Sequence, residues 1–238
     1  MRVLSENPYA VRLAETLPRV HERMARAAEA AHRSVDDVLL VAVTKSHPLD
    51  AVRAALDAGL THLGENRVEE LEEKVAQVGR EGVQWHMIGH LQRRKAARAA
   101  AVADLIHSVD TERLARRLSR VAVERAVEIA VLAQVNTSGE ETKSGLAPGE
   151  AVEAVHRMAE LPGLRVEGLM TMAPFVRDES VLGAAFARLR ELLEALHRAG
   201  APVGRELSMG MTNDLEIAIR EGSTMIRIGT ALFGERVQ

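Results

Sequence analysis

Short apolar runs alternate along the chain with longer segments in which apolar residues recur every three or four positions. The short runs are rich in β-branched residues and predict strands, whereas the wider spacing predicts amphipathic helices. We expect strands at 38–44, 61–64, 83–88, 105–109, 129–135, 164–170, 206–209 and 225–228. The run at 129–135 is continuously apolar, which is typical of a parallel strand covered on both faces.

A helix is expected after each strand, and Gly, Pro, Asp or Asn stands at most of the joints. The apolar spacing places helices at 49–56, 68–78, 92–101, 114–121, 152–159, 182–196 and 213–219. Asp110 is expected to cap the fourth of these. One more helix, with Leu17, Val20 and Met24 on one side, is expected before the first strand, with Pro18 in its first turn or at a kink.

Eight alternations of strand and helix in about 200 residues predict an α/β fold, a single (β/α)₈ TIM barrel rather than an open sheet. A chain of 238 residues suits one such domain, so we expect residues 1–238 to form one barrel and residues 1–37 to be a helical extension of it. We expect no additional β domain after the barrel.

Composition excludes several classes of function. The chain has 31 Lys and Arg against 34 Asp and Glu, a net charge of −3, so no overall positive field gathers nucleic acid or anionic lipid. It has no cysteine, which excludes disulfides, thiol nucleophiles and thiolate-held metals. Neither a signal peptide nor an apolar run long enough to span a bilayer is found. We therefore expect a cytoplasmic protein without a nucleic-acid or membrane partner.

Polar residues gather where the predicted strands end, which is the side of such barrels that carries the chemistry. In strand order they are Lys45; Glu65 and Asn66; His86 and His90; Ser108 and Asp110; Asn136; Thr171; Ser208 and Gly210; and Arg227, Gly229 and Thr230.

Lys45 is the first candidate, because it follows a buried apolar strand and burial lowers the pKa of a lysine. A partly neutral amine attacks aldehydes and ketones and forms Schiff bases with them. The alternative is a lysine that reaches water from the barrel end or pairs with Glu65.

The last two strand ends form the second candidate. Barrels commonly bind phosphate at the loops after strands seven and eight, and the segments 208–212 and 228–230 carry the required glycines. The alternative is that Gly210 and Gly229 serve only as turn residues. Arg227 is predicted on the same face as Gly229, and a buried arginine needs an acceptor, either a carboxylate such as Glu65 or a ligand ring nitrogen.

An imine-forming lysine with a phosphate site across the barrel is what pyridoxal 5′-phosphate requires, and a Schiff-base aldolase acting on a phosphosugar requires the same pair. Spacing alone does not separate these two functions.

The motifs resemble those of the pyridoxal phosphate homeostasis proteins, a family related in fold to the N-terminal barrel of alanine racemases. The matching stretches are VAVTKSHP around Lys45, HLGENRVEE at 62–70, WHMIGHLQRRK at 85–95, IHSVD at 106–110, QVNTSGEETKSG at 134–145, GLMTMAP at 168–174, LSMGMTND at 207–214 and GSTMIRIGTALFG at 222–234. They follow one another in order over nearly the whole chain.

The resemblance implies a role for each matching position. Lys45 is expected to hold pyridoxal phosphate as an internal aldimine, with Asn66 near the ring hydroxyl and Arg227 facing the pyridine nitrogen. Ser208, Gly229 and Thr230 are expected to hold the phosphate. The chain departs from the family pattern at His90, at Arg93 and Arg94, and at Asn213, none of which belongs to this set.

The function implied is intracellular pyridoxal phosphate homeostasis, in which the protein buffers the cofactor or delivers it to apoenzymes, acting as a monomer and without robust catalysis. The alternative is a weak pyridoxal-phosphate-dependent amino-acid racemase. Two-base racemisation needs a second acid/base, a tyrosine from an additional domain in alanine racemases, and the one tyrosine here is Tyr9, before the barrel. No metal site is expected from His86 and His90, and Lys143 is expected near the rim.

Overall fold

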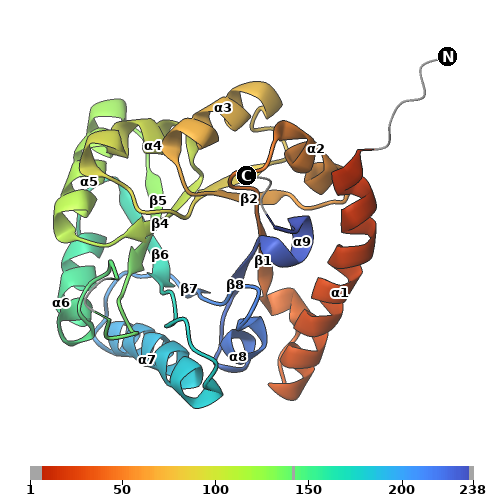
Figure 1. Ribbon diagram of the computed structural model, residues 1–238. Helices are drawn as coiled ribbons and strands as arrows, with labels where there is room; N and C mark the ends of the chain where they lie inside the picture. The colour runs from red at the N-terminus through yellow and green to blue at the C-terminus, as the bar shows by residue number, and fades with distance from the viewer. Residues whose placement is uncertain (1–6, 141–142, 236–238) are drawn as a thin grey trace.

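The structure is a computed structural model that describes residues 7–140 and 143–235. Its strands are all parallel and close into a barrel in which each strand pairs with the next and β8 pairs with β1 (Figure 1). The strands are β1 Leu39–Val43, β2 His62–Glu65, β3 Gln84–Met87, β4 Leu105–Val109, β5 Ile129–Gln134, β6 Leu164–Met170, β7 Glu206–Ser208 and β8 Met225–Ile228. The predicted (β/α)₈ barrel is confirmed.

Helices form a ring outside the strands (Figure 1). They are α1 Pro8–Ala30, α2 Leu49–Asp57, α3 Val68–Val78, α4 Ala96–Val102, α5 Glu112–Arg125, α6 Pro148–Ala159, α7 Glu179–Arg198, α8 Leu215–Arg220 and α9 Thr230–Phe233, with short 3₁₀ turns η1 Val35–Asp37 and η2 Arg93–Lys95. None of the described helices is both long and apolar enough to cross a membrane.

Two details of the helix ends differ from the sequence predictions. The cap of α5 is Thr111, whose Oγ1 accepts a hydrogen bond from Leu114 N at 3.3 Å, so the assignment of Asp110 was wrong by one residue. For Pro18, expected in the first turn or at a kink, the first turn is excluded: Pro18 lies inside α1, because the helix starts at Pro8, where Asn7 accepts from Tyr9 N at 3.0 Å. Both Asp and Thr cap helices well, so the sequence alone did not fix the starting residue.

The barrel closes where β1 meets β8, with Leu39 to Ala42 in register with Met225 to Ile228. Helix α1 covers this seam and packs against α2, α8 and α9. Thr16 Oγ1 donates to the carbonyl of Leu232 at 2.9 Å, and Arg23 pairs with Glu216 at 2.5 Å. The first helix therefore holds the first and last βα units together.

Most of the apolar core lies between the strands and the helices, where Trp85 and Phe186 are fully buried. Inside the barrel a second, small apolar cluster contains Leu105, Leu132, Met170 and Met225. The remaining interior positions include polar side chains, and these connect to the site described below.

Phe186 and Phe175 form a matched pair for testing how much this core contributes. Phe186 is fully buried on α7, whereas Phe175 is 92% exposed. We expect Phe186→Ala to lower the free energy of unfolding by about 3–5 kcal/mol, because it removes transfer energy and leaves a cavity, and Phe175→Ala to leave it nearly unchanged. The urea midpoint followed by circular dichroism measures both, and equal midpoints would contradict the packing described.

Candidate functional site

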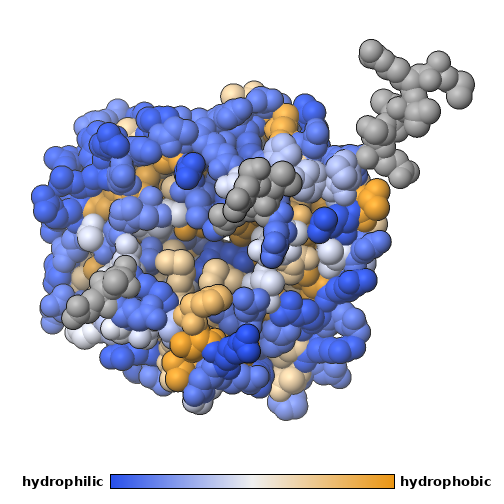
Figure 2. Space-filling view, viewed as in Figure 1, coloured by the Kyte–Doolittle hydropathy of each residue, from blue (hydrophilic) through white to orange (hydrophobic). Residues whose placement is uncertain are grey.

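A cavity of about 940 Å³ lies at the carboxyl ends of the strands. It is the hollow near the middle of the face seen in Figure 2, with apolar side chains along one edge. Of the six residues predicted to bind a cofactor, five line it: Lys45, Asn66, Arg227, Gly229 and Thr230. Residues from the first and the last strands therefore meet in one cavity.

Lys45 lies in a tight turn directly after β1 and is half-buried. His47 N donates to the carbonyl of Thr44 at 3.1 Å, and Ser46 N donates to Glu70 Oε1 at 2.6 Å. Ser46 has a φ of 61°, in the left-handed region that non-glycine residues rarely adopt. The turn fixes the backbone of Lys45 at the edge of the cavity.

A buried acid supports this turn from behind. Glu65 Oε1 accepts hydrogen bonds from Lys74 Nζ at 2.7 Å and from Thr44 Oγ1 at 2.5 Å. Its Oε2 is buried without a hydrogen-bond partner among the described residues. Burial raises the pKa of Glu65 to about 7, although Lys74 opposes this shift. The sequence had offered Glu65 as an acceptor for Arg227, and this was wrong, because Glu65 pairs with Lys74 of α3.

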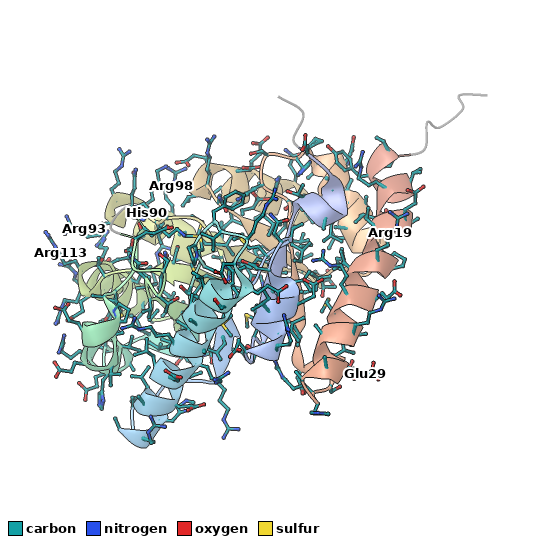
Figure 3. All side chains as sticks on the ribbon, turned by 60° about the horizontal axis from the view of Figure 1, so that its bottom comes forward. Arg19, Glu29, His90, Arg93, Arg98 and Arg113 are labelled. Atoms are coloured by element: carbon teal, nitrogen blue, oxygen red, sulfur yellow. The ribbon has the colours of Figure 1, made fainter. Side chains whose placement is uncertain are left out.

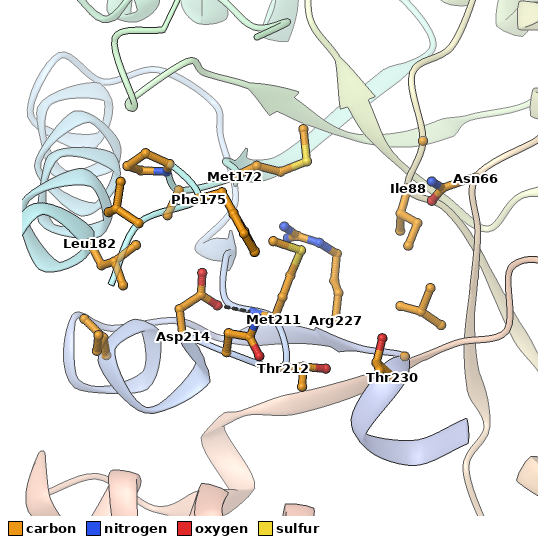
Figure 4. A pocket seen from close by; sticks show the side chains of 18 of the residues that line it. Asn66, Ile88, Met172, Phe175, Leu182, Met211, Thr212, Asp214, Arg227 and Thr230 are labelled. Atoms are coloured by element: carbon orange, nitrogen blue, oxygen red, sulfur yellow. Dashed lines mark hydrogen bonds between the residues drawn. The ribbon is translucent and has the colours of Figure 1, made fainter. Parts of the chain in front are cut away.

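Arg227 lies on the floor of the cavity and reaches into it beside Met211 (Figure 4). Its Nη1 donates to Ser208 Oγ at 2.6 Å and its Nη2 to the carbonyl of Thr171 at 2.9 Å. Burial lowers the pKa of Arg227 to about 10, and Asp214 counteracts part of that shift. The guanidinium thus stays charged near neutral pH.

No salt bridge to Arg227 occurs within residues 7–140 and 143–235. Its two hydrogen-bond acceptors are a hydroxyl and a carbonyl, which are neutral. A buried cation of this kind favours a ligand that brings negative charge or a lone pair. The cavity floor therefore suits an anionic ligand or a ring nitrogen.

Ser208, the sixth predicted residue, does not line the cavity. It is fully buried behind Arg227, and its Oγ also lies 2.9 Å from His107 Nδ1. Its direct contact is thus with the guanidinium, which itself faces the cavity.

Asn66 is placed at the cavity edge by a close approach of two strand ends. A Cβ on Gly89 would lie 2.2 Å from the carbonyl oxygen of Asn66, so only glycine fits there. Ser108 Oγ holds the same segment by donating to the carbonyl of Gly89 at 2.6 Å. In Figure 4, Asn66 lies on the opposite side of the cavity from Phe175 and Leu182.

The residues whose roles the sequence left open now have positions. His86 is buried in the barrel interior, whereas His90 lines the cavity and lies 3.1 Å from Asp110. Lys143 donates to the carbonyl of Ala173 at 2.9 Å. In the described part of the chain, no group of three or more potential ligands is arranged to hold a metal ion.

Sequence reasoning missed the apolar lip of the cavity. We define the lip as Met172, Phe175, Val176 and Met211, which are 37%, 92%, 45% and 36% exposed and line the cavity. Met172 and Met211 thus belong to the cavity wall and not to the packing of the barrel interior. Exposure of this kind depends on how far each loop stands out from the barrel, and no residue pattern carried that signal.

The histidine in β4 was also missed, although a signal existed. His107 stands two residues after Leu105, which faces the barrel interior, so the period of two along a strand predicts that His107 faces inward as well. It is fully buried there.

The basic run after β3, which consists of Arg93, Arg94, Lys95 and Arg98, is partly neutralised by the acidic face of α3. Lys95 lies 2.8 Å from Glu69, and Arg98 lies 2.5 Å from Glu72. Figure 3 shows Arg93, Arg98 and His90 on one side of the barrel. Opposite charges next to half of the run reduce its attraction for a polyanion.

Glu65 gives the site a measurable pH dependence. Its pKa is raised from 4.5 to about 7 in the folded chain, so between these values the native state keeps a proton that the unfolded state releases. The free energy of unfolding of the wild type should therefore fall relative to that of Glu65→Gln as pH rises from 4.5 to 7, by up to about 1.4 kcal/mol per pH unit.

Urea unfolding of both proteins at several pH values measures this difference. Glu73→Gln, at an exposed position of the neighbouring helix α3, should keep the wild-type slope. Parallel curves for wild type and Glu65→Gln would show that Glu65 titrates normally.

Comparisons with known proteins agree with this geometry. The family described as "Alanine racemase, N-terminal domain" matches residues 17–237. Two relatives named "Pyridoxal phosphate homeostasis protein" are similar over nearly their whole lengths. The one from Pseudomonas aeruginosa is 43% identical over 94% of this chain and 96% of its own, and the one from Aquifex aeolicus is 39% identical over 93% and 97%.

Solved structures give the same result. PipY of Synechococcus elongatus with PLP bound, 36% identical, superposes with a TM-score of 0.79 over 90% of this chain and 100% of its own. An alanine racemase of Clostridium difficile, only 14% identical, shares the fold with a TM-score of 0.76 over 92% of this chain and 57% of its own. The chain belongs to the alanine racemase N-terminal domain family and, within it, to the pyridoxal phosphate homeostasis proteins.

Proposed function

We propose that this chain binds pyridoxal 5′-phosphate in the cavity and serves pyridoxal phosphate homeostasis by holding the cofactor reversibly at Lys45. The observation that carries the proposal is that one cavity is lined by a lysine after β1 and a buried guanidinium of β8. The relative whose structure contains PLP is 36% identical over 90% of this chain, which supports the same ligand here.

The residues present fit the parts of this ligand. When bound, pyridoxal phosphate supplies an aldehyde that condenses reversibly with amines. Lys45 offers the amine at the cavity edge, and Arg227 offers a donor on the floor for the ring nitrogen. Gly229 and Thr230 lie at the start of α9, where backbone N–H groups and the threonine hydroxyl are suited to a phosphate.

Arg227 limits the chemistry of the site. A guanidinium that stays charged disfavours a second positive charge beside it, so it opposes protonation of the ring nitrogen. An unprotonated ring is a weaker electron sink. The arrangement thus favours storage and release over reactions that need a stabilised carbanion.

The open, half-buried setting of Lys45 suits exchange of the cofactor. We propose apoenzymes that use pyridoxal phosphate as the recipients. We propose that the protein acts as a monomer.

We do not propose racemase activity. Tyr9 contacts His47 and Phe233 on the outside of the barrel and does not line the cavity. The second acid/base that two-base racemisation needs is thus not supplied by the tyrosine. Incubation with L-amino acids followed by chiral chromatography should show no efficient loss of chirality.

The lysine assignment is tested by reductive trapping. Wild-type protein incubated with pyridoxal phosphate and reduced with borohydride should carry one cofactor on the peptide that contains Lys45, as seen by mass spectrometry. Lys45→Ala should lose this adduct and the visible absorbance, and it should keep its fold because the side chain is not part of the core. The control Lys143→Ala should retain both signals. An undiminished adduct in Lys45→Ala would overturn the assignment.

Ser208 tests the floor of the site. Ser208→Ala should weaken pyridoxal phosphate binding by about 1–3 kcal/mol, roughly 5- to 150-fold in Kd, because it removes a hydrogen bond to the charged Arg227. The control is Ser119→Ala. Ser119 is a buried serine of α5, and its Oγ donates a hydrogen bond to the carbonyl of Pro162. Equilibrium titration that gives one Kd for all three proteins would contradict the role of Ser208.

A further inference from the structure

A line of hydrogen bonds crosses the interior of the barrel. His62 Nδ1 lies 3.0 Å from His86 Nε2, and His86 Nδ1 lies 2.8 Å from His107 Nε2. His107 Nδ1 lies 2.9 Å from Ser208 Oγ, which accepts from Arg227 at 2.6 Å. These residues stand on β2, β3, β4, β7 and β8. We call His62, His86 and His107 the histidine chain.

The two ends of this line open at different faces of the barrel. Arg227 lines the cavity at the carboxyl ends of the strands, whereas His62 lines a second hollow at their amino ends, together with Leu39, Thr61 and Glu206. Between them, His86, His107 and Ser208 are buried. The line therefore connects the ligand cavity with the base of the barrel.

The protons in such a line are ordered together. A neutral imidazole has one N–H donor and one acceptor nitrogen, and each link needs one of each. In the first arrangement Ser208 donates to His107 Nδ1, and every histidine carries its proton on Nε2. In the second, every histidine carries its proton on Nδ1, and His107 donates to Ser208. Any mixture leaves a link with two donors or two acceptors.

Arg227 favours the first arrangement in the ligand-free protein. Ser208 Oγ accepts from Arg227, so its own O–H can donate to His107 and every group is satisfied. In the second arrangement Ser208 accepts twice, and its O–H is released from His107. A ligand acceptor that draws Arg227 Nη1 away from Ser208 leaves the hydroxyl free to accept from His107, and so it favours the second.

Passing between the arrangements moves one proton along the line. Ser208 gives its proton to His107 Nδ1, His107 gives its Nε2 proton to His86 Nδ1, and His86 gives its Nε2 proton to His62 Nδ1. Arg227 Nη1, which lines the cavity, returns a proton to Ser208 and takes one from the cavity. His62 then carries the positive charge or gives its Nε2 proton to water at the base. No bond other than these N–H and O–H bonds is made or broken.

Of the three histidines, only His62 is suited to carry a positive charge. Burial lowers the pKa of His86 to about 3, and burial together with His86 and Arg227 holds the pKa of His107 well below its usual range. His62 is half-buried, and Asp104 opposes the lowering of its pKa by burial. The second hollow, at the amino ends of the strands, is also lined by other charged or titratable groups: His21, Arg33, Asp36, Asp37 and Glu206.

We propose that the histidine chain is a proton relay that couples protonation of His62 at the base of the barrel to the hydroxyl of Ser208 beneath the ligand. A protonated His62 has hydrogens on both nitrogens, so it must donate to His86 and it enforces the second arrangement. This proposal rests on the proposed function only in taking pyridoxal phosphate as the ligand whose affinity the relay changes. By linkage, ligand binding raises the pKa of His62, and the ligand binds more tightly below that pKa.

The first test uses the ligand-free protein labelled with ¹⁵N in histidine. The two ring nitrogens have different shifts with and without a proton, so the spectrum reports each tautomer. At high pH, His86 and His107 should carry their protons on Nε2, and both should change to Nδ1 as His62 titrates. Titration of His62 without any change at His86 and His107 would overturn the relay, whether or not pyridoxal phosphate binds.

The second test measures binding of pyridoxine 5′-phosphate, which lacks the aldehyde and so removes the pH dependence of imine formation. Its Kd for the wild type should rise about fivefold or more as pH passes upward through the His62 titration, relative to its Kd for His62→Gln. His21→Gln, in the same hollow but outside the histidine chain, should follow the wild type. Parallel profiles for wild type and His62→Gln would overturn the relay.

The two tests separate failure of the relay from failure of the proposed function. If neither phosphate compound bound the wild type, the proposed function would fail, and the tautomer titration would still decide on the relay. If both bound with pH profiles unaffected by His62→Gln, the relay alone would fail.

Discussion

Closure of the barrel is the constraint on which the site depends. The pairing of β8 with β1 brings the residue that follows the first strand and the residues of the last strand to one mouth, although they are more than 180 positions apart in the sequence. Without this pairing, Lys45 and Arg227 would not line the same cavity. The hydrogen bonds of the ladder and the packing of α1 over the seam thus determine the geometry in which a small ligand can touch both.

Electrostatics of the interior follow from the same closure. Arg227 is enclosed by strands, and its hydrogen bonds go to a hydroxyl and a carbonyl. Lys74, by contrast, is buried outside the strands and is matched by Glu65 at 2.7 Å. Lys74, which supports the turn at Lys45, is therefore neutralised by Glu65, whereas Arg227 on the cavity floor is left to interact with a ligand. This division separates structural charge from binding charge.

Much of the fold and part of the site could be predicted from the sequence, because the signals were local. Apolar runs gave the bounds of β4, β6 and β8 without error, and strand ends indicated Lys45, Asn66 and Arg227. What could not be predicted depends on the stagger of strands far apart in the chain. Ser208 meets His107 across 101 positions, and no pattern in either segment fixes that register. Likewise, Lys74 as the partner of Glu65 depends on how α3 docks.

Helix α1 has a consequence for the order in which the protein comes apart. It packs against α2 of the first βα unit and bonds to α9 and α8 through Thr16 and Arg23, and the walls of the cavity stand on these units. Undocking of this helix would uncover the β1–β8 seam that joins the two walls. Loss of the bound ligand should therefore be an early step of unfolding. The fraction of cavities that hold ligand would then indicate whether β1 and β8 are still covered by α1.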